Sequence, residues 1–316
     1  MININLSQPI LLTGSTGFIG SNLLRYLINN KINVSIIIRK KSNLDRISDL
    51  IDSKFLNIFY ADLTEKRKIY KIIKKIKPKT IFHLATYGAY SFQSKRDLIK
   101  KNIIEGSLNL LDSCVEEGFD SFINTGSNSE YGFKDKAMSE KDLLEPNSYY
   151  SNFKATITNY CSFIAKKNKL NIVTVRPFHV YGPFEDNRRL IPNLINSLLI
   201  DKDIKMVSPK ISRDLIYIDD VIELYLIIAT SKVAFGKIYN MGTGIQTNML
   251  EIFSIAKKLC NSNSNALWNQ MQQRQWDQDI WLADMSLVKK ELGWTYSHSF
   301  EQGIAKTIDW YRNVQS

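Results

Sequence analysis

The chain has 316 residues, and its 44% hydrophobic and 23% charged content is typical of a globular protein with a large core. We find no apolar run of the roughly 18 to 20 residues that span a bilayer and no signal-peptide pattern, so we expect a cytoplasmic protein with no membrane partner. The three cysteines and three histidines are widely spaced, which predicts neither a disulfide framework nor a metal site.

The net charge of +11 raises the question of a nucleic-acid partner. Many of the positive residues are lysines interleaved with isoleucines at helical spacing, as in residues 66–79. That pattern is typical of an exposed helix face, so we expect no nucleic-acid partner. The positive balance instead suits a substrate that carries a diphosphate.

The N-terminal segment predicts a dinucleotide-binding turn. An apolar strand at 10–13 runs into three glycines and then into an apolar-periodic helix. Gly14 can make a tight turn, Gly17 lets the main chain approach a pyrophosphate, and Gly20 allows close packing of helix on strand. The helix N-terminus then faces the phosphates. The cofactor contacts expected here are Gly14, Thr16, Gly17, Phe18, Ile19 and Gly20.

Strands and helices alternate along the first half of the chain, which predicts βαβ units and a parallel sheet. After the first unit we expect strands at 33–38, 55–61, 80–84, 121–125 and 171–176, and helices at 65–77, 98–117 and 150–167. Beyond residue 177 we expect helices at 190–200, 221–230, 250–260 and 300–311 and a strand at 237–241, joined by irregular stretches.

This order predicts an α/β fold: a Rossmann doubly wound parallel sheet with a smaller mixed C-terminal lobe. We expect the dinucleotide-binding domain in residues 1–178, with parts of 212–245 returning to it. The substrate-binding lobe is expected mainly in residues 179–316. A substrate cleft is expected between the two.

A Tyr-x-x-x-Lys pair at Tyr150 and Lys154 predicts acid–base chemistry. Side chains four residues apart share one helix face. An ammonium at Lys154 would favour the phenolate of Tyr150 and lower its pKa from about 10 towards the working range, so that Tyr150 could exchange a proton with an alcohol or ketone. Tyr149 has no such partner, because residue 153 is Phe.

The TGxxGFIG glycine motif and the YxxxK pair resemble those of the extended short-chain dehydrogenase/reductase family, the NAD-dependent epimerases and dehydratases that act on nucleotide sugars. The resemblance implies a catalytic set of Ser127, Tyr150 and Lys154. It also implies that Asn102 shapes the central helix and supports a proton relay to Lys154, whereas we expect His83 to be a packed core residue. Cofactor contacts implied by the resemblance are Asp62, Leu63, Leu84, Ala85, Asn102, Thr125, Tyr150, Lys154 and Pro177.

Residues 127–129 discriminate between reactions of that family. Its sugar 4,6-dehydratases carry Thr-Asp-Glu here, an acid and a base for eliminating water, whereas this chain has Ser127, Asn128 and Ser129. Neither Asn nor Ser can serve as that acid–base pair, so the sequence disfavours dehydration.

The substrate assignments also follow from the resemblance. Residues 176–183 resemble the RPxNVYGP stretch at the substrate diphosphate, with His179 in place of the usual Asn. Arg213 opens a match to RDFVYVDDV, in which the Arg binds the diphosphate, and Arg274 stands where a second such Arg is expected. The expected substrate contacts are Thr86, Asn128, Ser129, His179, Arg188, Arg213 and Arg274.

Arg39, at the end of the second expected strand, bears on the cofactor. NAD enzymes of the family usually have an Asp near this position, whereas Arg39 and the basic residues after it would suit a 2′-phosphate. NADP is therefore favoured over NAD, although basic residues can also stack on adenine without that phosphate.

Together these features predict an oxidoreductase that transfers a hydride at a ring carbon, C4, of a nucleoside diphosphate sugar, with a 4-keto-sugar reductase or dehydrogenase favoured. A nucleotide-sugar 4-epimerase is the alternative, and a non-catalytic NAD(P)-binding regulatory protein is a third hypothesis. By resemblance we expect a homodimer formed through the helices at 98–117 and 150–167. The nucleotide base and the sugar stay open.

Overall fold

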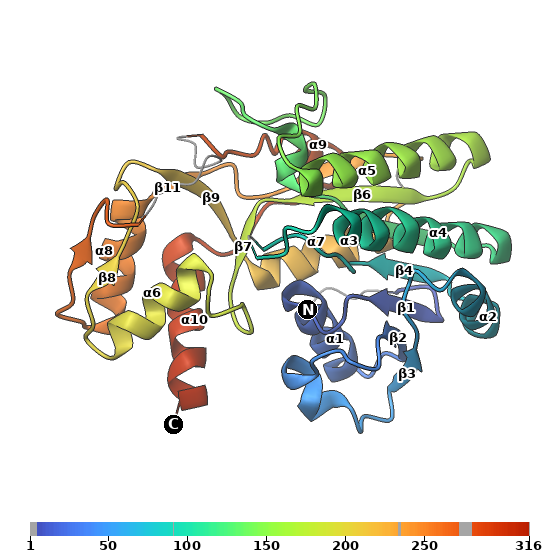
Figure 1. The fold of residues 1–316 in the computed structure, drawn as a ribbon, viewed down its shortest axis with the longest axis horizontal. Coiled ribbons are helices and arrows are strands. Elements are labelled where there is room, and N and C mark those ends of the chain that lie inside the picture. Colours follow the sequence, from blue (N-terminus) through green and yellow to red (C-terminus); the bar gives the residue numbers. More distant parts are fainter. Residues whose placement is uncertain (1–4, 91, 233–234, 272–279, 316) are drawn as a thin grey trace. The chain divides into compact units, whose positions relative to one another are not determined.

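The computed structural model describes residues 5–90, 92–232, 235–271 and 280–315. The chain divides into two compact units (Figure 1). Unit 1 comprises residues 1–132, 143–176 and 222–239, and unit 2 comprises residues 133–142, 177–221 and 240–316.

A seven-stranded sheet with the order β10-β6-β5-β4-β1-β2-β3 forms the centre of unit 1. Its strands are β1 (Ile10–Thr13), β2 (Val34–Ile38), β3 (Leu56–Tyr60), β4 (Thr80–His83), β5 (Ser121–Thr125), β6 (Ile172–Pro177) and β10 (Ile238–Met241). The pairings from β3 across to β6 are parallel. All residues of β1, β2 and β4 are buried, as expected for strands covered on both faces. The predicted doubly wound parallel sheet is confirmed.

Helices cover this sheet, and α4 and α5 run along one of its faces (Figure 1). The helices that contribute to unit 1 are α1 (Phe18–Asn29), α2 (Lys66–Ile76), α3 (Arg96–Lys100), α4 (Gly106–Glu117), α5 (Tyr149–Asn168) and α7 (Ile218–Thr230). Ile69, Ile73 and Ile76 of α2 are buried at i, i+4 and i+7, while the lysines between them are exposed. The interpretation of this lysine-rich segment as an exposed helix face is confirmed.

The helix predicted at 98–117 is present, but it is not α-helical throughout. Helix α3 ends at Lys100, a π-helical segment spans Lys101–Glu105, and α4 begins at Gly106. Asn102 lies in the π-helical segment and donates from Nδ2 to the Leu98 carbonyl at 2.8 Å. A π-turn inserts one extra residue into the helix, and apolar periodicity does not reveal such an insertion.

Unit 2 contains two small sheets in stretches where the sequence predicts irregular structure. A three-stranded mixed sheet has the order β11-β9-β7, with β9 antiparallel to β11 and parallel to β7. The strands are β7 (His179–Tyr181), β9 (Ser212–Tyr217) and β11 (Gln246–Asn248), and a second sheet pairs β8 (Ile204–Lys205) with β12 (Ala266–Leu267). Strands β7, β8, β11 and β12 hold two or three residues each, too few for a recognisable alternation, whereas β9 has six residues and was missed.

The other helices of unit 2 are α6 (Leu190–Leu199), α8 (Met249–Cys260), α9 (Ser286–Leu292) and α10 (Phe300–Gln315), of which α9 was not predicted. Two 3₁₀ turns, η1 (Asp45–Leu50) and η3 (Asn128–Tyr131), lie in unit 1. Among the described residues, no helix combines the length and the apolar character that crossing a membrane requires.

Candidate active site

The glycine turn after β1 is built so that larger residues would not fit. Gly14 has φ +76°, and a Cβ on it would lie 2.6 Å from the Ala85 nitrogen and the Leu84 carbonyl carbon. A Cβ on Gly20 would collide with the carbonyl oxygen of Gly14. The turn after β1 therefore packs directly on the chain that leaves β4 and on the first turn of α1.

The same turn fits the pyrophosphate of a dinucleotide. Gly17 is the N-cap of α1 and supplies no side-chain hydrogen bond, so the first amides of this 12-residue helix lack a side-chain cap. The hydroxyl of Ser15 is buried with no hydrogen-bond partner among the described residues. The turn lies between β1 and β4, where the strand order reverses, and this is where doubly wound sheets bind such ligands.

His83, the last residue of β4, is a core residue, as predicted. Its Nδ1 lies 2.7 Å from Thr13 Oγ1, and its Nε2 lies 2.8 Å from Ser107 Oγ on α4. Burial, with a contribution from the charge of Lys154, lowers the pKa of His83 to about 3. His83 is therefore neutral and joins β1, β4 and α4.

Lys154 lies buried on α5 beneath the end of β5. Its Nζ donates to the carbonyl oxygen of Thr125 at 2.7 Å. Tyr150 lies one helical turn earlier, half-buried, with its ring centre 6.0 Å from Nζ. Burial lowers the pKa of Lys154 to about 8, and the negative charge of Glu130 opposes that effect. The structure thus brings together three predicted residues: Thr125, Tyr150 and Lys154.

Ser127 begins the η3 turn immediately after β5. Its hydroxyl accepts from the amide of Ser129 at 3.2 Å and lies 2.8 Å from the Ser129 hydroxyl. Its own amide donates to Glu130 Oε1 at 2.8 Å, which completes a capping box. The predicted catalytic hydroxyl is therefore held at the same end of β5 as Thr125.

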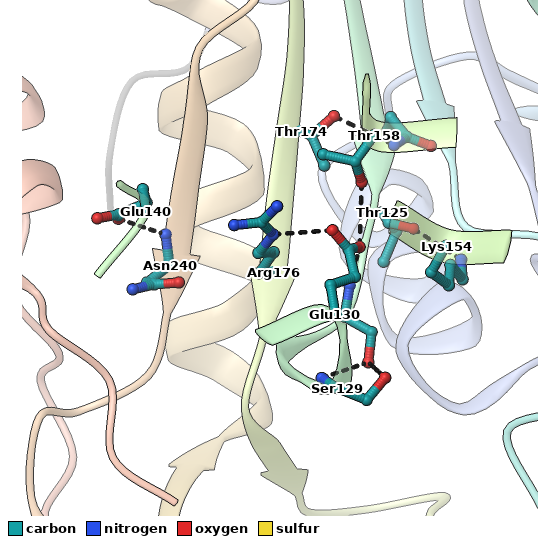
Figure 2. Close-up of polar contacts among 11 residues, drawn as sticks. Thr125, Ser129, Glu130, Glu140, Lys154, Thr158, Thr174, Arg176 and Asn240 are labelled. Atoms are coloured by element: carbon teal, nitrogen blue, oxygen red, sulfur yellow. Dashed lines mark hydrogen bonds and ion pairs between the residues drawn. The ribbon is translucent and has the colours of Figure 1, made fainter. Parts of the chain in front are cut away.

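Glu130 and Arg176 form an ion pair that the sequence analysis missed (Figure 2). Arg176 Nε donates to Glu130 Oε2 at 2.9 Å, and the hydroxyl of Thr158 on α5 donates to Glu130 Oε1 at 3.0 Å. Both charged side chains are at most 1% exposed. A Ser with Glu three residues later signals the capping box, but the pattern does not reveal that this Glu is buried beside a residue 46 positions away.

The other predicted cofactor residues lie at several places in unit 1. Asp62 accepts at Oδ1 from the amide and the hydroxyl of Thr64, at 2.9 and 2.8 Å. Arg39 is exposed just after β2, where its amide donates to Ser42 Oγ at 3.1 Å. Leu63 lies against α4, and its carbonyl accepts from Asn109 Nδ2 at 2.9 Å.

The predicted substrate residues differ in their surroundings. In unit 2, His179 on β7 has a buried Nδ1 with no hydrogen-bond partner among the described residues. Burial and the nearby Arg213 and Arg189 charges hold the pKa of His179 well below its usual value. Arg188 is exposed and forms a two-point ion pair with Asp186, at 2.8 and 2.6 Å.

Three other predicted substrate residues are Thr86, Asn128 and Arg274. In unit 1, Thr86 is exposed and Asn128 is half-buried in η3. Arg274 lies outside the described residues. Within the part of the chain that the structure describes, no group of three or more His, Cys, Asp or Glu side chains could hold a metal ion.

Comparisons with known proteins show the family and the fold. The NAD dependent epimerase/dehydratase family matches residues 10–242. The dTDP-D-glucose 4,6-dehydratase of Dictyostelium discoideum is 27% identical over 97% of this chain and 82% of its own length.

Two solved structures are similar over almost the whole chain. One is the UDP-glucuronic acid 4-epimerase of Bacillus cereus in complex with UDP-glucuronic acid and NAD, with a TM-score of 0.85 and 26% identity over 96% of this chain and 99% of that one. The UDP-glucose 4-epimerase of Thermotoga maritima has a TM-score of 0.88 and 23% identity over 97% and 99% of the two chains, which supports the fold.

Proposed function

Because the chain belongs to the NAD dependent epimerase/dehydratase family, we propose that it transfers a hydride at C4 of a nucleoside diphosphate sugar, acting as an NAD(P)-dependent 4-keto-sugar reductase. The observation that carries the proposal is the buried ammonium of Lys154, bonded to Thr125 at 2.7 Å and one helical turn from Tyr150. The glycine turn that fits a dinucleotide follows β1, and a single strand, β4, separates β1 from β5 in the sheet.

In this proposal the side chains control a proton and the orientation of the sugar. The dinucleotide, when bound, supplies the hydride. Tyr150 gives its hydroxyl proton to the oxygen at C4, and the positive charge of Lys154 stabilises the phenolate left behind. Ser127 orients the carbonyl by turning its hydroxyl from Ser129 towards the sugar oxygen.

The residues of η3 argue against a 4,6-dehydratase, the activity named for the Dictyostelium relative. Elimination of water needs one group to donate a proton and another to remove one. Asn128 carries a neutral amide, and the hydroxyl of Ser129 already bonds to Ser127. Neither side chain has an ordinary pKa that suits this chemistry near neutral pH.

Arg39 supports NADP and therefore reduction. It is exposed at the end of β2, where a ribose 2′-phosphate would lie in a doubly wound fold. The turn that it forms with Ser42 adds a hydroxyl and two further lysines to this end of the strand. In NADPH the 2′-phosphate would meet cations here, whereas the diol of NADH would lack a carboxylate partner at Arg39.

A 4-epimerase is the second candidate, because the Bacillus cereus 4-epimerase shares the fold over nearly the whole chain. Identifying the nucleotide that the denatured protein releases, by mass spectrometry, separates the two. A protein that is purified empty and then binds NADPH more tightly than NADH supports the reductase. Stoichiometric NAD retained through purification supports the epimerase.

A pair of neighbouring tyrosines provides the matched test of the chemistry. Tyr150→Phe removes the proposed proton donor, and we expect kcat/KM to fall about 10²- to 10⁴-fold with cofactor affinity retained. Tyr149→Phe is the control, because Tyr149 is 56% exposed, stacks on Phe153 and has the guanidinium of Arg96, not a buried lysine, over its ring. Equal loss in both variants would count against the proposed role of Tyr150.

We also propose that the protein is a homodimer that associates through α4 and α5. Phe163 on α5 is 56% exposed, as expected for an apolar residue that a partner covers. Light scattering should give about twice the chain mass of 36.4 kDa, and Phe163→Asp should shift the equilibrium to monomer. A monomeric wild type would refute this proposal.

A further inference from the structure

We propose that the buried Glu130 carboxylate is a positioning residue of the candidate active site, which ties the Ser127 turn to α5 and β6 and supplies the negative charge that balances Lys154. This inference rests on the proposed function for the roles of Ser127 and Lys154. Glu130 itself touches neither substrate nor cofactor in the proposal.

The bonds of Glu130 reach three elements (Figure 2). Oε1 accepts from the amide of Ser127 at 2.8 Å and from the hydroxyl of Thr158, one turn beyond Lys154, at 3.0 Å. Oε2 accepts from Arg176 Nε on β6 at 2.9 Å. A shift of Glu130 would therefore move the start of η3 relative to the helix that carries Tyr150 and Lys154.

The packing around the carboxylate leaves it little freedom. A Cβ on Gly126 would lie 2.5 Å from Glu130 Oε1, so this neighbour must be small. The guanidinium of Arg176 lies over the ring of Tyr131, 4.5 Å from its centre. Glu130 is thus enclosed by fixed groups on the sides of η3 and β6.

Charge balance is the second part of the inference. Burial raises the pKa of Glu130, but Arg176 keeps its positive charge when buried, and that charge and the hydrogen bonds from Arg176, Thr158 and Ser127 act in the opposite direction and favour the ionised carboxylate. Glu130 lies on the side of Arg176 that faces Lys154 (Figure 2). Burial lowers the pKa of Lys154, and the negative charge of Glu130 raises it. The two effects together give a pKa of about 8. Lys154 therefore keeps its proton near neutral pH with the help of Glu130.

Other titratable groups face the same pair. Cys161 on α5 interacts with both Glu130 and Lys154, and burial raises its thiol pKa to about 12, so it stays neutral. His83 on β4 interacts with Lys154 and is neutral because its pKa is about 3. The Tyr150 ring also lies near Lys154. Of these groups around Lys154, Glu130 is therefore the one that carries the negative charge.

The test measures the pKa of Lys154 directly, by NMR of protein labelled with ¹³C at lysine Cε. The Lys154→Arg variant assigns the signal. In E130Q the size and the oxygen acceptor are kept but the charge is lost, and we expect the pKa of Lys154 to fall by about one pH unit or more. Because Arg176 would lose its counterion, E130Q/R176M provides a second variant that removes both buried charges.

Two controls separate charge from packing. Thr158→Val removes one bond to Glu130 but keeps the carboxylate, and Glu116→Gln removes one negative charge from the exposed face of α4. Thr158→Val should move the pKa of Lys154 much less than E130Q does, and Glu116→Gln should leave it unchanged. An unchanged pKa of Lys154 in both E130Q and E130Q/R176M would overturn the inference.

The pH profile of kcat/KM is measured on the same variants. If Lys154 acts as proposed, the basic limb shifts to lower pH together with the NMR value. If the NMR value shifts and the basic limb does not, the charge role of Glu130 is supported and the proposed role of Lys154 fails. A failure of the inference about Glu130 and a failure of the proposed role of Lys154 therefore give different results.

Discussion

Glu130 in unit 1 and Asp214 in unit 2 are both fully buried carboxylates, and they are satisfied in different ways. Glu130 in unit 1 is bonded by a guanidinium, a hydroxyl and one amide, and it influences the ionisation of Lys154. Asp214 in unit 2 accepts from the amides of Thr243, Gly244 and Ala283 at 2.8 to 3.0 Å and from the Thr243 hydroxyl at 2.7 Å.

The difference teaches what a buried carboxylate can do. Amides from separate chain segments have fixed positions, so a carboxylate that binds them fixes the path of the backbone. Asp214 in this way joins β9 to the loop before β11 and to the strand-like segment at Ala283. A carboxylate that lies near a lysine, as Glu130 does, also raises the pKa of that lysine. We therefore expect changes at Asp214 to alter stability and changes around Glu130 to alter the pH dependence of activity.

The largest loss of activity is expected when Lys154, whose pKa the charge of Glu130 raises, is replaced. Lys154→Met should lower kcat/KM about 10²- to 10⁴-fold, because Tyr150 loses the cation that stabilises its phenolate. The melting temperature should also fall modestly, because the carbonyl of Thr125 loses its buried donor. Steady-state kinetics and calorimetry on one preparation provide the measurement, and kcat/KM within a few-fold of wild type would contradict the account.

Asp214→Ala tests whether this buried carboxylate of unit 2 contributes to stability alone. Three amides, of which only that of Ala283 belongs to a buried residue, would lose their acceptor, and we expect the free energy of unfolding to fall by about 3 kcal/mol. The shape of the pH profile should stay that of the wild type. Asp219→Ala is the control, because Asp219 is 58% exposed and its loss should change stability by less than about 0.5 kcal/mol. Urea titration measures both; equal effects would refute the distinction.

The pH dependence of the wild type follows from Lys154. Its pKa is lowered from 10.5 to about 8, so the ammonium persists below that pH and kcat/KM should fall above it. The unfolded chain keeps this proton up to its higher pKa. Between pH 8 and 10.5 the unfolded state therefore binds more protons, and this group makes the folded protein more stable as the pH rises. Comparing the pH dependence of unfolding in wild type and Lys154→Met checks the sign.

The smallest effect is expected at Tyr225 on α7. Its hydroxyl lies 2.8 Å from Thr125 Oγ1, and the carbonyl of the same threonine accepts from Lys154. Tyr225→Phe removes one hydrogen bond of about 0.5–1.5 kcal/mol and should lower kcat/KM about 2- to 10-fold. A loss as large as that of Lys154→Met would mean that Tyr225 takes a direct part in the reaction.

Local signals in the sequence account for what could be predicted. The glycines after β1 and the spacing of Tyr150 and Lys154 each depend on fewer than a dozen adjacent residues, and the parallel sheet follows from repeated strand–helix alternation. His83 was expected in the core, and the structure buries it as the last residue of β4.

The parts that could not be predicted depend on contacts between distant residues. Glu130 and Arg176 are 46 positions apart, and Asp214 and Ala283 are 69 apart, so no local pattern joins either pair. The π-helical segment at Lys101–Glu105 leaves the apolar spacing of a helix almost unchanged. The paired strands β8 and β12 have two residues each, too few to show alternation.

The most direct test of the central claim is isotope transfer from NADPH deuterated at nicotinamide C4 to a nucleotide-linked 4-keto sugar. The account predicts a product with one deuterium at sugar C4, formed by the wild type and Tyr149→Phe but about 10²- to 10⁴-fold more slowly by Tyr150→Phe. A wild type that binds NADPH and the sugar nucleotide but leaves C4 unlabelled would contradict it.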